Sequence, residues 1–386
     1  MLRLLRHARG YAPELLGVRD VLVAGGRIAW IGERADLPPA LGAAESDLGG
    51  RRLVPGFVDC HVHLTGGGGE AGHGSSVPPL PVERYTRGGV TTVVGLLGTD
   101  DAVRTPGSVV AAAYALRAHG LSAWCWTGGY HLPPATVTGT IRGDITLLDP
   151  VIGVGEVAIS DHRSSQPTFE ELARLGAEAH VGGLMSGKAG MVHLHLGDGP
   201  RGLELVRRAL AETELPAGTW QPTHVNRRKA LFDEAAELAR RGVPVDVTAF
   251  PVAEGEDAWS AADAVRLWLE RGLPADRLTM STDAGGCLPV FDAEGRVAAM
   301  DVGSPGALAA ALRDLLASGV PLEHALPCVT STPASLLRLP AKGRIAVGAD
   351  ADLVVLDEAG AVTDVMARGT WHLKDGAAVV TDPFSR

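Results

Sequence analysis

The stretch from Val54 to Leu64 constrains the fold of this chain more than any other, because an apolar strand runs directly into a His-x-His pair. Residues two apart in an extended strand share a face, so Asp59, His61 and His63 are expected to point the same way. Two imidazole rings then converge on one point, where they can bind zinc or a similar divalent metal. A lone His-x-His is more often a pair of surface histidines. The Pro-Gly turn before this strand and the glycine run Gly66–Gly69 after it favour the metal site.

Strand-like runs alternate with helical patterns through the middle of the chain. The eight strand-like runs are residues 57–63, 90–96, 122–127, 151–159, 191–196, 219–225, 244–248 and 278–283. Helical patterns fill most of the gaps, for example 108–118, 169–180, 203–213 and 230–241. This alternation predicts an α/β fold, a (β/α)8 TIM-type barrel over residues 55–340. An open dinucleotide-binding sheet is disfavoured, because no Gly-x-Gly-x-x-Gly motif opens a helix after the first strand.

The two ends of the chain have a different pattern. Residues 20–24 and 27–32 flank a Gly-Gly turn, which indicates a β-hairpin. Similar short strand-like runs return only near the other end, at 343–345, 351–357, 362–368 and 371–376. We therefore expect residues 1–54 and 341–386 to form one small β-sandwich domain.

Composition narrows the class of partner. The 386 residues carry a formal net charge of −10 without a block of like charges, which argues against nucleic acid or an anionic membrane surface and favours a small molecule. The four cysteines lie far apart without Cys-x-x-Cys spacing, so neither a disulfide framework nor a structural zinc site is indicated. The N-terminus has no signal-peptide pattern, and no run of about eighteen apolar residues occurs. The expected location is the cytoplasm.

Metal-binding residue types recur at the ends of the predicted strands. In a (β/α)8 barrel the chemistry takes place at the C-terminal ends of the strands. Four histidines and two acids fall at or near those ends: His61, His63, Glu156, His195, His224 and Asp283. Any one of them could be a buried polar core residue, but the joint occurrence of six indicates a two-metal site. Such a site activates a bridging water and polarises a carbonyl oxygen.

At these residues the chain resembles the amidohydrolase superfamily and, within it, the isoaspartyl dipeptidases. His-x-His alone would indicate only the superfamily, but Glu70 together with Tyr130 and two arginines narrows the resemblance to the dipeptidases. The segments that carry the resemblance are 59–64, 66–72, 91–100 (TTVVGLLGTD), 127–131, 159–164 and 222–227.

The resemblance implies an enzyme that cuts β-aspartyl dipeptides with two divalent metal ions, for which zinc suits a histidine-rich site with carboxylates. By resemblance, Asp283 would bind one metal with the His-x-His pair, while His195 and His224 would bind the second. Asp283 would also be the general base, which passes a proton from the bridging hydroxide to the leaving amine. Tyr130 would donate to the carbonyl oxygen and stabilise the oxyanion. A homo-oligomer, an octamer, is implied as well.

Substrate recognition follows the same resemblance. A β-aspartyl dipeptide carries one ammonium group and two carboxylates, so its site needs one anion and two cations. Glu70 would bind the ammonium group, and Arg163 and Arg227 would bind the carboxylates as bidentate partners. Groups near Gly68 and Thr99 would add hydrogen bonds.

Two positions, Glu156 and Cys287, depart from the family pattern, and His193 is an alternative to one of the expected ligands. The family's bridging ligand is a lysine carboxylated by CO2, but Glu156 stands at that place, in a segment one residue longer than the family pattern. We hypothesise that Gly155 lets the backbone bulge, so that Glu156 bridges the metals without a carboxylated lysine. The alternative is that Glu156 lies behind the ligands and one metal suffices. Cys287 replaces a substrate-binding serine with a weaker hydrogen-bond donor. His193 shares a face with His195, which is preferred as the ligand because His-Leu-Gly-Asp matches the motif.

Two other functions stay open. A related amidohydrolase could act on a cyclic imide, a hydantoin-like ring or an N-acyl substrate. Glu156 favours this reading slightly, whereas Glu70 and the two arginines argue against it because a neutral ring needs no such charges. From a different class, the chain could be a non-catalytic barrel scaffold. Loss of ligands would mark a scaffold, and here every expected ligand position except the lysine is filled.

Overall fold

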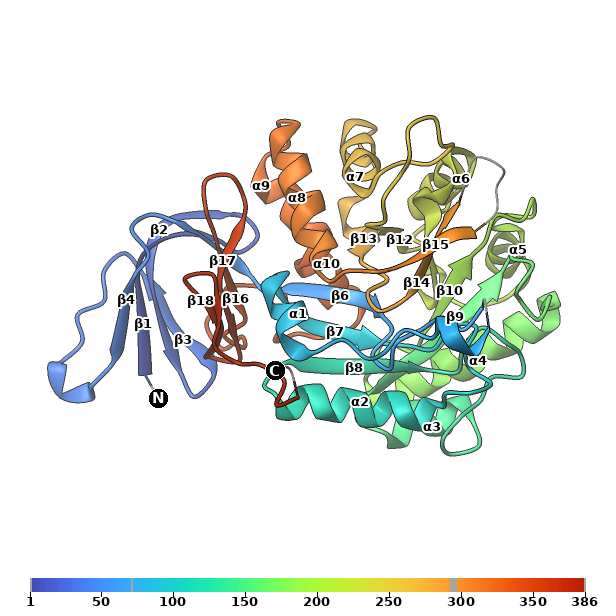
Figure 1. The fold of residues 1–386 in the computed structure, drawn as a ribbon, viewed down its shortest axis with the longest axis horizontal. Coiled ribbons are helices and arrows are strands. Elements are labelled where there is room, and N and C mark those ends of the chain that lie inside the picture. The colour runs from blue at the N-terminus through green and yellow to red at the C-terminus, as the bar shows by residue number, and fades with distance from the viewer. Residues whose placement is uncertain (1, 71, 292–296, 385–386) are drawn as a thin grey trace.

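The computed structural model describes residues 2–70, 72–291 and 297–384, which form an α/β body and a smaller all-β body (Figure 1). All eight predicted strands of the α/β body are present, and each is parallel to the strands with which it pairs. In chain order they are β6 (Phe57–Val62), β7 (Val90–Gly95), β8 (Ser122–Thr127), β9 (Val151–Ile159), β10 (Met191–Leu196), β11 (Trp220–Thr223), β12 (Val245–Thr248) and β13 (Leu278–Ser281).

Hydrogen bonds join these strands in two parallel sheets. β6 to β11 form one six-stranded sheet in chain order, and β12 pairs with β13 in a second sheet. β11 contacts β12, and β13 contacts β6. Within the described residues the ladders do not close into one continuous barrel. β11 has only four residues, and one of them, Pro222, has no backbone N–H to donate to a second neighbour.

Helices follow most of the parallel strands, and the predicted helical patterns lie within or overlap them. α2 and α4 begin at capping boxes, in which Thr105 and Thr168 accept hydrogen bonds from the backbone of the first turn. α2 and α3 lie along one flank of the parallel strands, and α7 and α8 lie along the opposite flank (Figure 1). The helices are α1 (Val82–Arg87), α2 (Pro106–Ala118), α3 (Ile141–Leu147), α4 (Phe169–Ser186), α5 (Glu204–Glu212), α6 (Lys229–Arg240), α7 (Ala261–Glu270), α8 (Ala307–Ala317), α9 (Leu322–Ala325) and α10 (Ser331–Leu336).

The two chain ends form a single hydrogen-bonded sheet, as the sequence predicts for one unit built from both. β5 pairs with β16 in antiparallel register, with Leu53 opposite Val355, and this pair joins the two ends. The strand order is β19-β18-β17-β16-β5-β1-β2-β3, and β4 pairs with β1. These strands are β1 (Leu2–Tyr11), β2 (Leu15–Ala24), β3 (Arg27–Gly32), β4 (Ala44–Asp47), β5 (Arg52–Pro55), β16 (Leu353–Leu356), β17 (Val362–Ala367), β18 (Thr370–Lys374) and β19 (Ala377–Ala378).

One strand-like run predicted in this sheet is wrong. Residues 343 and 344 form a bend, and residue 345 has no regular secondary structure. Ile345 is nevertheless buried in the core of the sheet, beside Leu53 and Val355, so its apolar character reflects packing and not strand pairing. The predicted boundaries at 54/55 and 340/341 stay predictions.

Strand alternation explains how polar groups reach the inside of the α/β body. In β10, Val192, Leu194 and Leu196 belong to the large apolar core. His193 and His195 occupy the alternate positions and point to the opposite face. A hairpin, β14 (Cys287–Phe291) and β15 (Val297–Val302), follows β13 and was not predicted. None of the described helices is both long and apolar enough to cross a membrane.

Candidate active site

The six predicted metal ligands lie together at the C-terminal ends of the parallel strands. Their ligand atoms form three overlapping groups, and within each group all atoms lie within 4.8 Å of one another. The four histidines and Glu156 are buried, and Asp283 is half-buried. The groups are His61, His63 and Glu156; His61, His224 and Asp283; and Glu156, His195 and His224.

The carboxylate of Glu156 lies between the histidines of the two halves of the cluster. Its Oε1 is 3.6 Å from His63 Nε2, and its Oε2 is 3.5 Å from His61 Nε2. The same Oε2 lies 3.1 Å from His195 Nδ1 and 3.6 Å from His224 Nε2. One carboxylate therefore faces all four imidazole rings, which is the position that a group bridging two cations requires.

A β-bulge brings Glu156 into the cluster. The pairing of β9 with β10 shifts register between Val154 and Val157, so β9 has two residues where β10 has one. Those two residues are Gly155 and Glu156. Only glycine fits at position 155, because a Cβ there would lie 2.7 Å from the backbone oxygen of His193. The bulge predicted at Gly155 is therefore present.

The cluster fits a divalent metal ion. His61 Nε2 and Asp283 Oδ1 are buried and have no hydrogen-bond partner among the described residues. They lie 3.3 Å apart, and His63 Nε2 lies 3.0 Å from the same oxygen. Buried polar atoms without partners are costly, and imidazole nitrogens around carboxylate oxygens are the donor set that zinc and related ions prefer. A bound cation would supply the missing partner.

The pKa values of Glu156 and Asp283 are lowered in the cluster, and the pKa of the neighbouring Tyr130 is raised. Burial alone would raise the pKa of Glu156, but the charge of His61 and the hydrogen bond from His195 hold it well below its usual range. Burial likewise opposes ionisation of Asp283, while His61 and His63 lower its pKa. Burial and the neighbouring Glu156 raise the pKa of the Tyr130 hydroxyl well above its usual value. At neutral pH both carboxylates are therefore ionised and the phenol keeps its proton.

Four of the predicted substrate residues are connected beside this cluster. Arg163 Nη1 lies 2.9 Å from Glu70 Oε2, and Thr99 Oγ1 donates to Glu70 Oε1 at 2.8 Å. The Arg163 guanidinium carbon lies 5.5 Å from the centre of the Tyr130 ring. The Tyr130 hydroxyl is in turn 2.8 Å from His195 Nδ1. Charged groups of both signs thus adjoin the candidate metal-binding atoms.

The remaining predicted substrate residues are Arg227, Gly68 and Cys287. Arg227 Nη1 donates to the backbone oxygen of Leu196 at 2.7 Å and lies 3.4 Å from His195 Nε2. Gly68 adopts a φ of +80°, and a Cβ there would lie 3.3 Å from the sulfur of Cys287. Gly68 and Cys287 are therefore adjacent. Ala71, part of the glycine-rich segment that carries the resemblance, lies outside the described residues.

Several residues behind the cluster were not predicted. Asp161 Oδ2 accepts hydrogen bonds from His195 Nε2 at 3.0 Å and from Arg163 Nη2 at 2.8 Å, so one carboxylate holds a predicted ligand and a predicted substrate residue. His224 Nδ1 bonds to Thr248 Oγ1 at 2.7 Å. Asp59 does not join the cluster. Its carboxylate accepts the backbone N–H of Thr282, the residue before Asp283. The position of Asp161 directly after a strand could have indicated it from the sequence.

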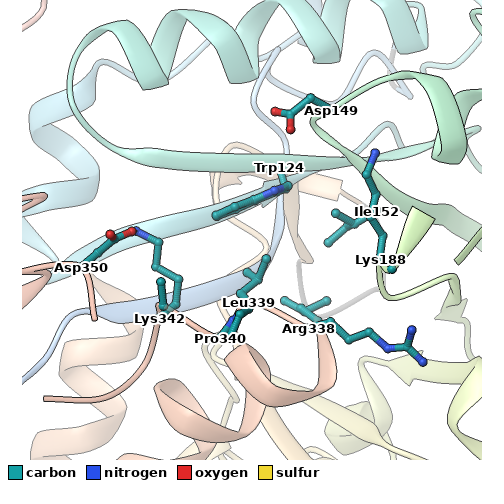
Figure 2. A pocket seen from close by; sticks show the side chains of 12 residues that line it. Trp124, Asp149, Ile152, Lys188, Arg338, Leu339, Pro340, Lys342 and Asp350 are labelled. Atoms are coloured by element: carbon teal, nitrogen blue, oxygen red, sulfur yellow. The ribbon is translucent and has the colours of Figure 1, made fainter. Parts of the chain in front are cut away.

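A separate pocket lies at the opposite ends of the strands. Trp124 and Ile152, near the starts of β8 and β9, line a cavity of about 260 Å³. Lys342 and Asp350 point toward each other at its edge, with Nζ and Oδ2 2.8 Å apart (Figure 2). The pocket contains none of the six predicted ligands. Since barrel chemistry belongs to the C-terminal strand ends, this pocket is not the candidate active site.

Comparison with known proteins agrees with this geometry. The profile of the amidohydrolase family matches residues 52–372. The crystal structure of β-aspartyl dipeptidase from Fervidobacterium islandicum, in complex with a β-Asp-Leu dipeptide, is 41% identical and superposes with a TM-score of 0.91, covering 98% of each chain. Dihydropyrimidinase from Brevibacillus agri is 17% identical with a TM-score of 0.70, covering 98% of this chain and 96% of the other, and shares the fold.

Curated relatives match only locally. Imidazolonepropionase from Ralstonia nicotianae is 36% identical over 135 residues, which is 32% of this chain and 32% of the relative. The chain thus matches about a third of the length of that relative and 14% of the length of the imidazolonepropionase from Cupriavidus necator.

Proposed function

This chain belongs to the amidohydrolase family, and from that membership and the geometry of its site we propose that it is a dipeptidase that hydrolyses β-aspartyl dipeptides with two divalent metal ions. One observation carries the proposal. Such a dipeptide requires one anion and two cations, here Glu70, Arg163 and Arg227. Glu70 pairs with Arg163, and both arginines approach His195 Nε2, at 3.2 and 3.4 Å.

The metal ions that this proposal requires would be held by the six clustered residues. His61, His63 and Asp283 would hold one ion and His195 and His224 the other, with Glu156 between them. When bound, two such ions activate a water and polarise the carbonyl group to be cleaved. The assignment of Glu156 as the bridging group rests on its contacts with all four histidines. The four lysines of the chain are Lys188, Lys229, Lys342 and Lys374, and each is engaged away from this cluster.

The protein's own residues move the proton and hold the substrate. Asp283 accepts a proton from the attacking water and delivers it to the leaving amine, for which its ionised, half-buried carboxylate is suited. Tyr130 keeps its proton at neutral pH and donates a hydrogen bond to the substrate oxygen that becomes negative. Glu70 binds the substrate ammonium group, and Arg163 and Arg227 bind its carboxylates. Groups near Gly68 and Thr99 add hydrogen bonds, and Cys287 takes the place of the serine that holds the aspartyl end.

Finer features of the assembly form part of the same proposal. The contacts of β11 with β12 and of β13 with β6 support a (β/α)8 barrel. We further propose that the bound ions are zinc, that both chain ends form one β-sandwich domain, and that the enzyme is a cytoplasmic homo-oligomer. Neither nucleic acid nor a membrane is a proposed partner.

The experiment that tests the function compares hydrolysis of β-Asp-Leu, α-Asp-Leu and dihydroorotate by zinc-loaded protein in buffer stripped of bicarbonate. Turnover of β-Asp-Leu alone is the expected result, because only this substrate offers the required charges around a β-linked amide. Turnover without bicarbonate also supports Glu156 as a bridge that needs no CO2. No cleavage of β-Asp-Leu, even after bicarbonate is restored, would contradict the proposal. Cleavage of dihydroorotate instead would favour the cyclic-amide alternative.

A further inference from the structure

His193 is a buried histidine that faces the cluster without belonging to it. Its Nε2 lies 2.9 Å from His61 Nδ1, whereas its other nitrogen, Nδ1, lies 3.1 Å from Gln221 Oε1. The ring stacks parallel to Trp126, with centres 5.1 Å apart and an angle of 1° between the planes. Both ring nitrogens and one ring face are therefore occupied by protein, which leaves no atom of His193 for a metal.

The contact with Gln221 continues into a chain of buried hydrogen bonds. Gln221 Nε2 donates to Thr279 Oγ1 at 3.3 Å, and Thr279 Oγ1 donates to Asp246 Oδ1 at 2.5 Å. Each of these residues, and His193 and His61 as well, is 0% exposed. We call the series His61, His193, Gln221, Thr279 and Asp246 the buried relay.

The hydrogen bonds to Asp246, at the end of the buried relay, fix which partner donates in every hydrogen bond of the series. The Asp246 carboxylate accepts three hydroxyl groups, because Thr223 and Ser281 also donate to it. A hydroxyl has one proton, so Thr279, which donates that proton, can only accept from Gln221. The Gln221 amide must then turn its nitrogen to Thr279 and its oxygen to His193.

The same order of donors and acceptors continues through His193 to His61, which belongs to the metal cluster. With Gln221 Oε1 as the acceptor, His193 Nδ1 carries the proton and donates it. His193 Nε2 is then an acceptor, so His61 Nδ1 must donate. In the neutral ring that a metal ion requires, the lone pair of His61 consequently lies on Nε2, the atom that faces Glu156 and Asp283 at 3.5 and 3.3 Å.

We propose that His193 and Gln221 are positioning residues, which orient the His61 ring and fix its tautomer for metal binding through the buried relay anchored at Asp246. Two other predicted ligands are held by a direct hydrogen bond to the ring nitrogen that faces away from Glu156. His195 bonds directly to Asp161, and His224 bonds directly to Thr248. The proposal rests on the metal site of the proposed function and is independent of its substrate.

Two pairs of variants test this role. His193→Phe keeps an aromatic ring against Trp126 but has no acceptor for His61, whereas His193→Gln keeps an acceptor and a donor in the same order. Gln221→Met removes the acceptor for His193 with little change in shape. Thr92→Val is the matched control, because Thr92 is a buried residue of β7 whose hydroxyl has no partner among the described residues.

Zinc affinity, measured by competition with a chromophoric chelator, is the first readout. Loss of an outer partner of a ligating histidine typically weakens metal binding by about 10- to 100-fold, and we expect that loss in His193→Phe and Gln221→Met. His193→Gln and Thr92→Val should stay close to wild type. The second readout is the NMR spectrum of cobalt(II)-loaded protein, in which the Nδ1–H of His61 gives a hyperfine-shifted resonance that the relay protects from solvent exchange.

The outcomes separate this proposal from the proposed function. Wild-type zinc affinity together with an unchanged His61 N–H resonance in Gln221→Met would overturn the relay, even if the enzyme cleaves β-Asp-Leu. An equal loss in His193→Gln and His193→Phe would also overturn it, because the shape of the ring and not its hydrogen bonds would then matter. Weaker zinc binding that His193→Gln restores supports the relay whichever substrate the enzyme hydrolyses.

Discussion

The carboxylate of Glu70 and the guanidinium group of Arg163 form an ion pair, with Oε2 and Nη1 2.9 Å apart. The two groups proposed to bind opposite charges of the substrate thus bind each other in this structure. Arg163 is further neutralised by Asp161, which accepts from Nε and Nη2. A ligand with both an ammonium group and a carboxylate can replace both partners at once. A ligand with one charge leaves the other member of the pair without its partner, which favours zwitterionic substrates.

Replacing Glu70 tests this exchange. Glu70→Gln should lower kcat/KM for β-Asp-Leu by roughly 10- to 100-fold, because it removes a charge-assisted hydrogen bond to the ammonium group. Zinc content should not change, since Glu70 is outside the cluster. Thr99→Val is the control, which removes the hydroxyl that supports Glu70 and should have a smaller effect. Unchanged kcat/KM in Glu70→Gln would rule out the role assigned to Glu70.

Replacing Glu156 tests the bridging carboxylate. Glu156→Gln keeps the size of the side chain but removes the charge that faces four imidazole rings, so the number of zinc ions bound per chain should fall sharply. Zinc can be counted by atomic emission after gel filtration. Full occupancy together with the wild-type rate would show that Glu156 is not a ligand.

Tyr130→Phe tests the oxyanion donor. Removal of one such donor typically lowers kcat by about 100- to 1,000-fold. The phenylalanine ring can still pack against Arg163, so KM and zinc content should change little. Steady-state kinetics with β-Asp-Leu separates the two parameters. A rise in KM at constant kcat would instead assign Tyr130 to ground-state binding.

His372 predicts a dependence of stability on pH. The ring is 0% exposed, and neither nitrogen has a hydrogen-bond partner among the described residues. Burial lowers the pKa of His372 in the folded state, so its unfolded state binds a proton first as the pH falls. The neutral ring therefore favours folding above the ordinary histidine pKa of about 6.5, and this contribution is lost as the pH falls below that value.

The measurement is urea unfolding at pH 7.5 and pH 5.5. Wild type should lose more unfolding free energy between the two pH values than His372→Phe, in which the titrating group is absent. Because the two proteins differ only at position 372, the difference between them isolates His372. Equal losses in the two proteins would contradict the prediction.

Local sequence patterns determined the strands and the identity of the candidate ligands. Alternation of apolar and polar residues, as in Met191–Leu196, is a property of a single strand and can be read without its neighbours. The same holds for His61 and His63, which share a face because they are two residues apart. The strand expected at 343–345 was wrong because strand pairing, unlike burial of Ile345, requires a partner elsewhere in the chain.

The tertiary structure decided which ring nitrogen of each histidine faces the cluster. His195 turns Nδ1 to Glu156, whereas His224 turns Nε2 to it, because Asp161 and Thr248 occupy their other nitrogens. The motif His-Leu-Gly-Asp already favoured His195 over His193 as the ligand, but only the structure shows that His193 bonds to His61 and Gln221 behind the cluster. Such differences depend on the register of strands that are distant in sequence, and a hydrogen bond forms only when that register brings donor and acceptor within about 3 Å.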